Sequence, residues 1–149
     1  MLFVSGLAFS QMPNIEKVWL NNSQPYHGTI GNQKQEIKLK INVSEQNKKD
    51  DQEYFVAGYS LVDRNYTKFE GNIKITKYRN GKKKSVVFGE YDFAEEPKGQ
   101  RSGTMKGKFV YSFRWNSATE KIDSQFIKFI GDWSSYDDTL KEKTILISE

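Results

Sequence analysis

Glycine recurs in this chain at positions that strand-forming sequences normally avoid. Six times a glycine stands two residues after a bulky or apolar side chain and, in most copies, two residues before another, as in Met105-Lys106-Gly107-Lys108-Phe109. Two residues is the side-chain period of a β-strand, so each glycine shares a strand face with its large neighbours. Because glycine weakens a strand unless the backbone must bend or approach another segment, the pattern predicts a strongly curved sheet. Its expected pivots are Gly28, Gly58, Gly71, Gly89, Gly107 and Gly131.

Strand-like segments follow one another along the chain, separated by turn residues. In the segment 35–43, apolar Ile37, Leu39, Ile41 and Val43 alternate with polar residues. Asn80-Gly81 is the dipeptide typical of a two-residue type I′ hairpin. A short extended piece is expected at 17–20, ahead of eight longer strands. Those strands are expected at residues 25–31, 35–43, 53–62, 66–77, 85–93, 103–115, 121–133 and 140–148.

The connections between these segments are too short for crossover helices, which indicates sequential antiparallel pairing. Eight such strands can close into an up-and-down barrel and leave no free edge. A sandwich of two four-stranded sheets is the structural alternative. The layer of glycines favours the barrel, because small residues are needed where the sheet bends. The predicted fold class is therefore all-β, an eight-stranded antiparallel up-and-down barrel.

Composition narrows the range of functions. The chain has 149 residues, a net charge of +4 and no cysteine. This length suits one domain, expected at residues 11–149. No apolar run approaches the roughly 20 residues of a spanning helix, so no transmembrane segment is expected. Without cysteine there is no disulfide or thiol chemistry. The mild, dispersed positive charge favours solubility over nucleic-acid binding.

The N-terminal residues 1–10 are interpreted as the tail of a truncated signal peptide. Leu2 to Phe9 is a short apolar run, and Ala8-Phe9-Ser10 places small residues where a signal peptidase inspects the chain. The alternative is a buried first strand. Gln11-Met12-Pro13-Asn14 would break such a strand, which favours the signal peptide. The protein is therefore expected to be exported, either secreted or periplasmic.

The strand count, the signal-like N-terminus, the aromatic-x-Gly strands and Phe129-Ile130-Gly131-Asp132-Trp133 together carry a resemblance. The chain resembles the calycin-type barrels, the lipocalin-like and avidin-like proteins, and more narrowly the small exported lipocalin-like proteins of the Bacteroidetes group. The resemblance implies a barrel whose lumen takes a small ligand. One barrel architecture hosts many functions, so the implied fold is more specific than the implied ligand.

Residues that could support catalysis or bind a metal are sparse. His27 is the single histidine and is expected on the outer face. Paired carboxylates at Asp50-Asp51, Glu95-Glu96 and Asp137-Asp138 fall in predicted loops and are interpreted as solvated turns. None shows the spacing of a calcium loop. We expect no catalytic residue, no metal site and no cofactor, and hence a protein that is not an enzyme.

The inward strand face is rich in aromatic residues. An eight-stranded barrel is just wide enough either to be filled by side chains or to hold one small ligand. In the first case the glycines make room for the aromatics. In the second they widen a pocket for a small apolar or amphipathic molecule. The candidate ligand-binding residues are Tyr26, Ser60, Phe69, Tyr91, Phe109, Tyr111, Phe129 and Trp133.

The outward face also carries apolar residues, which need a cover. The candidates are Phe55, Tyr59 and Phe88. The N-terminal segment 11–22 is one candidate cover. A protein partner or a second copy of the chain is the other, which gives the alternative function of an exported inhibitor or surface-complex component.

Overall fold

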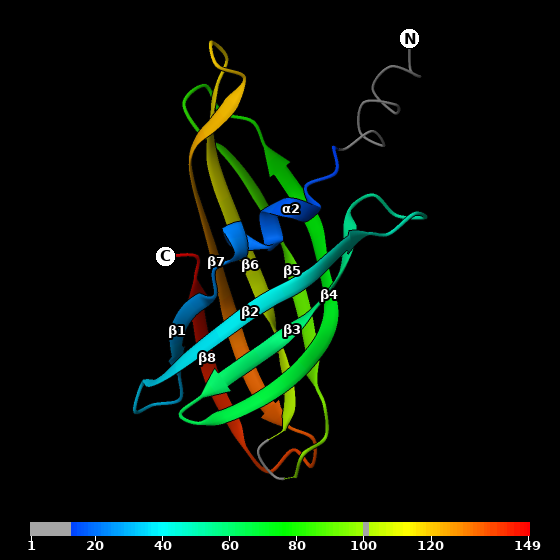
Figure 1. Ribbon diagram of the computed structural model, residues 1–149, viewed down its shortest axis with the longest axis vertical. Helices are drawn as coiled ribbons and strands as arrows, with labels where there is room; N and C mark the ends of the chain where they lie inside the picture. The colour runs from blue at the N-terminus through cyan, green and yellow to red at the C-terminus, as the bar shows by residue number, and fades with distance from the viewer. Residues whose placement is uncertain (1–12, 100–101) are drawn as a thin grey trace.

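The computed structural model, which describes residues 13–99 and 102–149, is a closed barrel of eight antiparallel strands (Figure 1). Each strand pairs with its sequence neighbours, and the first pairs with the last. The predicted up-and-down barrel is confirmed. The expected signal peptide at residues 1–10 lies outside the described residues. The strands are β1 (Tyr26–Ile30), β2 (Gln35–Gln46), β3 (Glu53–Val62), β4 (Asn65–Arg79), β5 (Ser85–Glu95), β6 (Gly103–Asn116), β7 (Lys121–Ser135) and β8 (Lys141–Ile147).

The six glycines lie where adjacent strands come unusually close. A Cβ placed on any of them would lie 1.6–2.2 Å from a backbone carbonyl oxygen of the neighbouring strand. On Gly107 of β6, for example, it would lie 2.2 Å from the carbonyl oxygen of Ile130 on β7. No side chain fits at that distance, so glycine permits the tight coiling that closes the sheet.

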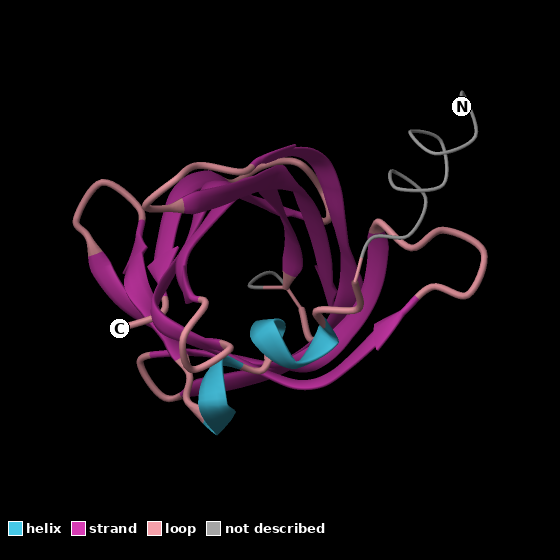
Figure 2. Cartoon of the chain, turned by 90° about the horizontal axis from the view of Figure 1, so that it is seen from above, coloured by secondary structure: helices cyan, strands magenta, loops and turns pink. Residues whose placement is uncertain are grey.

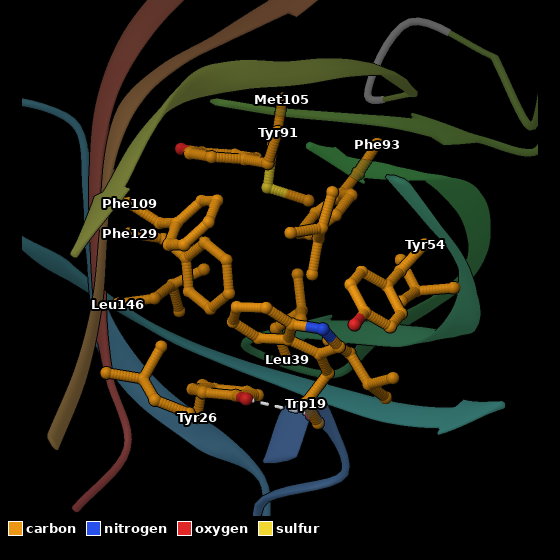
Figure 3. Packing of buried hydrophobic residues seen from close by; sticks show 14 of the residues in the cluster. Trp19, Tyr26, Leu39, Tyr54, Tyr91, Phe93, Met105, Phe109, Phe129 and Leu146 are labelled. Carbon is orange, nitrogen blue, oxygen red and sulfur yellow. Dashed lines mark hydrogen bonds between the residues drawn. The ribbon is translucent and has the colours of Figure 1, made fainter. Parts of the chain in front are cut away.

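Aromatic rings fill the space that the glycines leave. Gly89 pairs with Phe109 on the adjacent strand, and a Cβ on Gly89 would lie 2.4 Å from the Phe109 ring. Phe129 makes edge-on contacts with Tyr26 and Tyr91, with ring centroids 5.1 Å apart in both pairs (Figure 3). Such pairs add to the free energy gained from burial alone.

One end of the barrel is closed by the N-terminal segment. The helical turn α2 (Glu16–Trp19) and the 3-10 turn η1 (Asn21–Ser23) precede β1, and Figure 2 shows a helical turn lying inside the ring of strands. The Trp19 side chain is fully buried, with its ring 5.1 Å from Phe109 and 5.9 Å from Tyr54. The Tyr26 hydroxyl donates a 2.8 Å hydrogen bond to the Trp19 carbonyl.

This segment corrects two predictions. Residues 17–20 are not an extended piece, because Glu16–Trp19 forms a helical turn. The described part of segment 11–22 is also not a cover for the outer face. Its backbone is tied to the barrel end, where the Ile15 amide donates to the Tyr54 hydroxyl over 3.0 Å and Glu16 accepts from the Gln46 amide.

Local backbone irregularities correct two further predictions. The β2–β3 register shifts between Ile41 and Val43. Val43 is therefore 40% exposed, although alternation predicted that it shares a face with the buried Ile37, Leu39 and Ile41. The expected type I′ turn at Asn80-Gly81 is wrong, since neither residue has the positive φ that it requires. Residues 80–84 form a longer loop, in which Asn80 accepts a 2.9 Å hydrogen bond from Ser85. Among the described residues, no helix has the length and apolar character needed to cross a membrane.

Replacing a pivot glycine is expected to destabilise the barrel. In Gly107→Ala the new methyl group would meet the Ile130 carbonyl, and the strands would have to separate. We expect a loss of about 1–3 kcal/mol in the free energy of unfolding, measured by urea denaturation. Lys108→Ala, on the exposed face of the same strand, is the control and should change stability by less than about 0.5 kcal/mol. Equal, small effects of both changes would contradict the close approach.

Removing the Trp19 side chain is expected to destabilise the protein more than replacing a pivot glycine. Trp19→Ala would empty the closed end of the barrel and should lower the free energy of unfolding by about 3–5 kcal/mol. Trp115→Ala provides a matched control, because that tryptophan is 54% exposed. Thermal or urea denaturation of the two variants measures the difference. A Trp19 variant as stable as the Trp115 variant would show that α2 does not pack into the barrel.

Candidate functional site

The two ends of the barrel differ in how they are filled. The end of the barrel opposite α2 lies at the bottom of Figure 1. At this end the lumen contains a cavity of about 900 Å³. Ile37, Met105 and Trp133 form its apolar depth, and each is at most 8% exposed. Its rim comes from the connections that follow β1, β3, β5 and β7. The lumen is thus packed with aromatics at one end and hollow at the other.

A buried carboxylate lies on the wall of this cavity. Glu95 is 6% exposed, and three donors from three different strands surround it. Its Oε1 atom accepts from the Trp133 indole N–H at 2.8 Å and from the Gly103 amide at 3.1 Å. Its Oε2 atom accepts from the Ser60 hydroxyl at 2.7 Å. Indole and amide groups can only donate, so this arrangement fits an ionised carboxylate.

The position of Glu95 corrects the sequence-based interpretation of Glu95-Glu96 as a solvated turn. Strand β5 continues to Glu95, and the inward parity of Tyr91 and Phe93 carries its side chain into the lumen. The Tyr136 hydroxyl also bonds the Glu95 carbonyl, which fixes the end of the strand. Glu96 follows the end of β5, and its pKa is lowered, first by the hydrogen bond from the Lys68 amide. Continuing the alternation of β5 by two residues beyond Phe93 would have predicted an inward-facing Glu95.

The predicted lumen residues separate into two groups. All eight are buried, but among them Ser60 and Trp133 line the cavity. The others belong to the packed core: Phe69 packs against Phe93, and the remaining five contact one another or Trp19. The Tyr26 and Tyr111 hydroxyls donate within the protein, to the Trp19 carbonyl and to the Gln125 side chain. The six residues in this packed group are Tyr26, Phe69, Tyr91, Phe109, Tyr111 and Phe129.

The predicted outer patch is dispersed along the barrel wall. Strand β4 lies between the strands that carry the three residues, so their partners on β4 give their spacing. Tyr59 and Phe55 on β3 pair with Lys68 and Asn72, and Phe88 on β5 pairs with Lys77. Nine residues of strand separate the two ends of this set, roughly 30 Å at 3.3 Å per residue. Tyr59 also stacks on Tyr66 with centroids 4.8 Å apart. The structure does not bring the three residues into one patch.

The polar residues of the rim were not predicted, because no periodicity in the sequence tells which end of a barrel is open. Arg64 and Lys98 stand in connections, and Glu142 is the second residue of β8. These three residues contribute charges of both signs to the rim. Lys98 is engaged with the Glu96 carboxylate at 3.4 Å and with the Tyr66 carbonyl at 3.3 Å. The rim is therefore polar, and it surrounds the apolar depth of the cavity.

In residues 13–99 and 102–149, no three acidic or histidine side chains lie close enough to hold a metal ion. His27 sits on β1 opposite Lys38 and Ile147, away from the cavity. Compared with protein-family models, curated proteins and solved structures, the chain matches none. The geometry of the barrel itself therefore has to carry the functional conclusion.

The packed tyrosines predict a dependence of stability on alkaline pH. Burial raises the pKa of Tyr91 and of Tyr111 to about 12 each, against about 10 for an exposed phenol. The folded state thus holds these protons more tightly than the unfolded state. The contribution of these two tyrosines to stability should be constant below about pH 9 and should fall as the pH rises from about 10 through 12.

Urea denaturation at a series of pH values measures this fall, and Tyr91→Phe should reduce it. Tyr78→Phe is the control, because Tyr78 is 47% exposed. The same alkaline fall in the Tyr91 variant as in the wild type would contradict the assignment of this effect to Tyr91.

Proposed function

We propose that this protein is an exported, lipocalin-like barrel that binds a small amphipathic molecule at the open end of its lumen. The observation that carries the proposal is the asymmetry of the lumen: aromatic packing and Trp19 fill one end, while a cavity of about 900 Å³ remains at the other. Ligand pockets in proteins commonly measure about 300–1,000 Å³. The volume thus supports a ligand of ordinary small-molecule size.

The lining of the cavity supports an amphipathic ligand over a purely apolar one. Ile30, Val62 and Leu140 line the cavity and keep accessible apolar surface, which favours binding through burial. A hydrocarbon would also displace water from the polar rim, where Arg64 and Glu142 would lose hydrogen bonds. A molecule with both an apolar body and a polar group can pack against the apolar lining and form hydrogen bonds with the polar residues of the cavity.

The proposal assigns no reaction to the protein. Both oxygens of Glu95 already accept hydrogen bonds from protein donors, which suits an anchoring group better than a base that must collect a proton. His27 stands outside the cavity lining. Binding would then work through shape and desolvation.

A protein-interaction module remains the alternative function. The separation of Phe55, Tyr59 and Phe88 along the wall weakens it, since a docking surface needs its apolar residues together. Apolar cross-strand neighbours are exposed at two places: Ile130 and Ile145 are 48% and 42% exposed, and Trp115 and Ile122 are 54% and 39% exposed. Each such pair is small beside the interfaces of stable complexes.

Filling the cavity tests the proposal. Val62 lines the cavity at the end of β3, so Val62→Trp should occupy its volume. The probe is N-phenylnaphthylamine, a neutral dye whose fluorescence rises in apolar surroundings. We expect the wild type to bind the dye and Val62→Trp to bind it about tenfold or more weakly.

Leu61→Trp is the matched control, because it places the same side chain on the opposite face of the same strand. It should bind the dye like the wild type. No binding by the wild type, or equal binding by both tryptophan variants, would reject a ligand site in the open end.

A further inference from the structure

We propose that the cavity recognises a positively charged group, specifically the ammonium of an amphipathic amine, through the Glu95 carboxylate. This inference rests on the proposed ligand-binding function and names the ligand class for the same site. Its starting point is a charge without a counter-ion: Glu95 is 6% exposed, and no lysine, arginine or histidine among the described residues forms an ion pair with it.

The hydrogen bonds of Glu95 leave room for one more donor. An ionised carboxylate offers about four acceptor positions on its two oxygens. Two positions on Oε1 are taken by Trp133 and Gly103, and one on Oε2 by Ser60. The remaining acceptor position belongs to Oε2, on a residue that lines the cavity. A ligand N–H can therefore bind Glu95 without displacing any protein donor.

The surroundings favour a cation over a neutral donor. Glu95 is two residues nearer the open end than Phe93. The aromatic core therefore lies directly next to Glu95, on the side away from the open end. Apolar Ile37 and Met105 also line the cavity and reduce the water that could screen the carboxylate. The Trp133 ring adds an aromatic surface, which attracts ammonium groups.

The positive residues at the rim do not replace such a ligand. Lys98 pairs with Glu96 and donates to the Tyr66 carbonyl. Arg64 is exposed to solvent at the mouth. The cationic head of a ligand would thus sit on Glu95, with its apolar body against Val62 and Leu140.

Three probes with one carbon chain and different heads test the inference: octylammonium, octanol and octanoate. We expect isothermal titration calorimetry near pH 7 to show octylammonium binding about tenfold or more tightly than octanol, because hydrogen bonds to charged groups are roughly twice as strong as neutral ones. Octanoate should bind most weakly. This ranking is measured on the wild-type protein and needs no variant.

The Glu95→Gln variant should remove the preference for the ammonium. The glutamine carbonyl can still accept from Trp133 and Gly103, and its amide can donate to Ser60, so the fold should persist. Glu96→Gln is the matched control: it removes the same charge one residue away, from a side chain that pairs with Lys98 and does not line the cavity. It should keep the preference, and thermal denaturation verifies that both variants are folded.

The outcomes separate this inference from the proposed function. Equal binding of all three probes by the wild type, or tighter binding of octanoate, would leave the ligand-binding cavity standing and overturn the role of Glu95. A preference for octylammonium that survives Glu95→Gln would overturn it as well. If none of the three probes binds and N-phenylnaphthylamine also fails, both proposals fall together.

Discussion

The close approach of neighbouring strands at the pivot glycines is the constraint on which the rest of this structure depends. Where a Cβ would lie 1.6–2.2 Å from a carbonyl oxygen, only glycine lets the sheet coil tightly enough to close. Closure removes the sheet edges and turns one face of every strand inward. The aromatic side chains then share a narrow interior, and rings such as Phe109 fill the space over glycines such as Gly89.

The two ends of the barrel interior differ in how they are filled. At one end Trp19 enters from the N-terminal segment and packs edge-on against Tyr54, Phe109 and Tyr111. At the other end the aromatic packing stops near Phe93, and Glu95 replaces a further apolar side chain. Burying that carboxylate is unfavourable unless donors surround it, and Ser60, Gly103 and Trp133 provide them. Glu95 and its three donors mark the boundary between the packed core and the cavity.

The sequence predicted the architecture well because the signals for it are local. Alternation identified the strands, and the glycine repeat favoured closure over a sandwich. It also placed Phe69, Phe109 and Trp133 correctly in the interior, where each is at most 8% exposed. Departures from strict alternation were harder to foresee: the bulge before Val43 follows from strand pairing, which a single strand does not reveal.

The candidate site was only partly predictable, since it depends on which end of the barrel is filled. Ser60 and Trp133 were identified by parity, but nothing in the sequence distinguishes them from Tyr26 or Phe129, which belong to the packed core. Trp19 was expected in an extended piece, and its insertion into the barrel decides which end remains open. Glu95 was hidden by its neighbour Glu96, because paired carboxylates beside a proline usually indicate a loop.

The most direct test of the account is a crystal structure of the protein grown with N-phenylnaphthylamine. We expect density for the dye in the open end, beside Val62, Leu140 and Trp133, with Trp19 still closing the opposite end. Density for the dye only on the outer wall, or an open end filled by side chains of the protein itself, would contradict it.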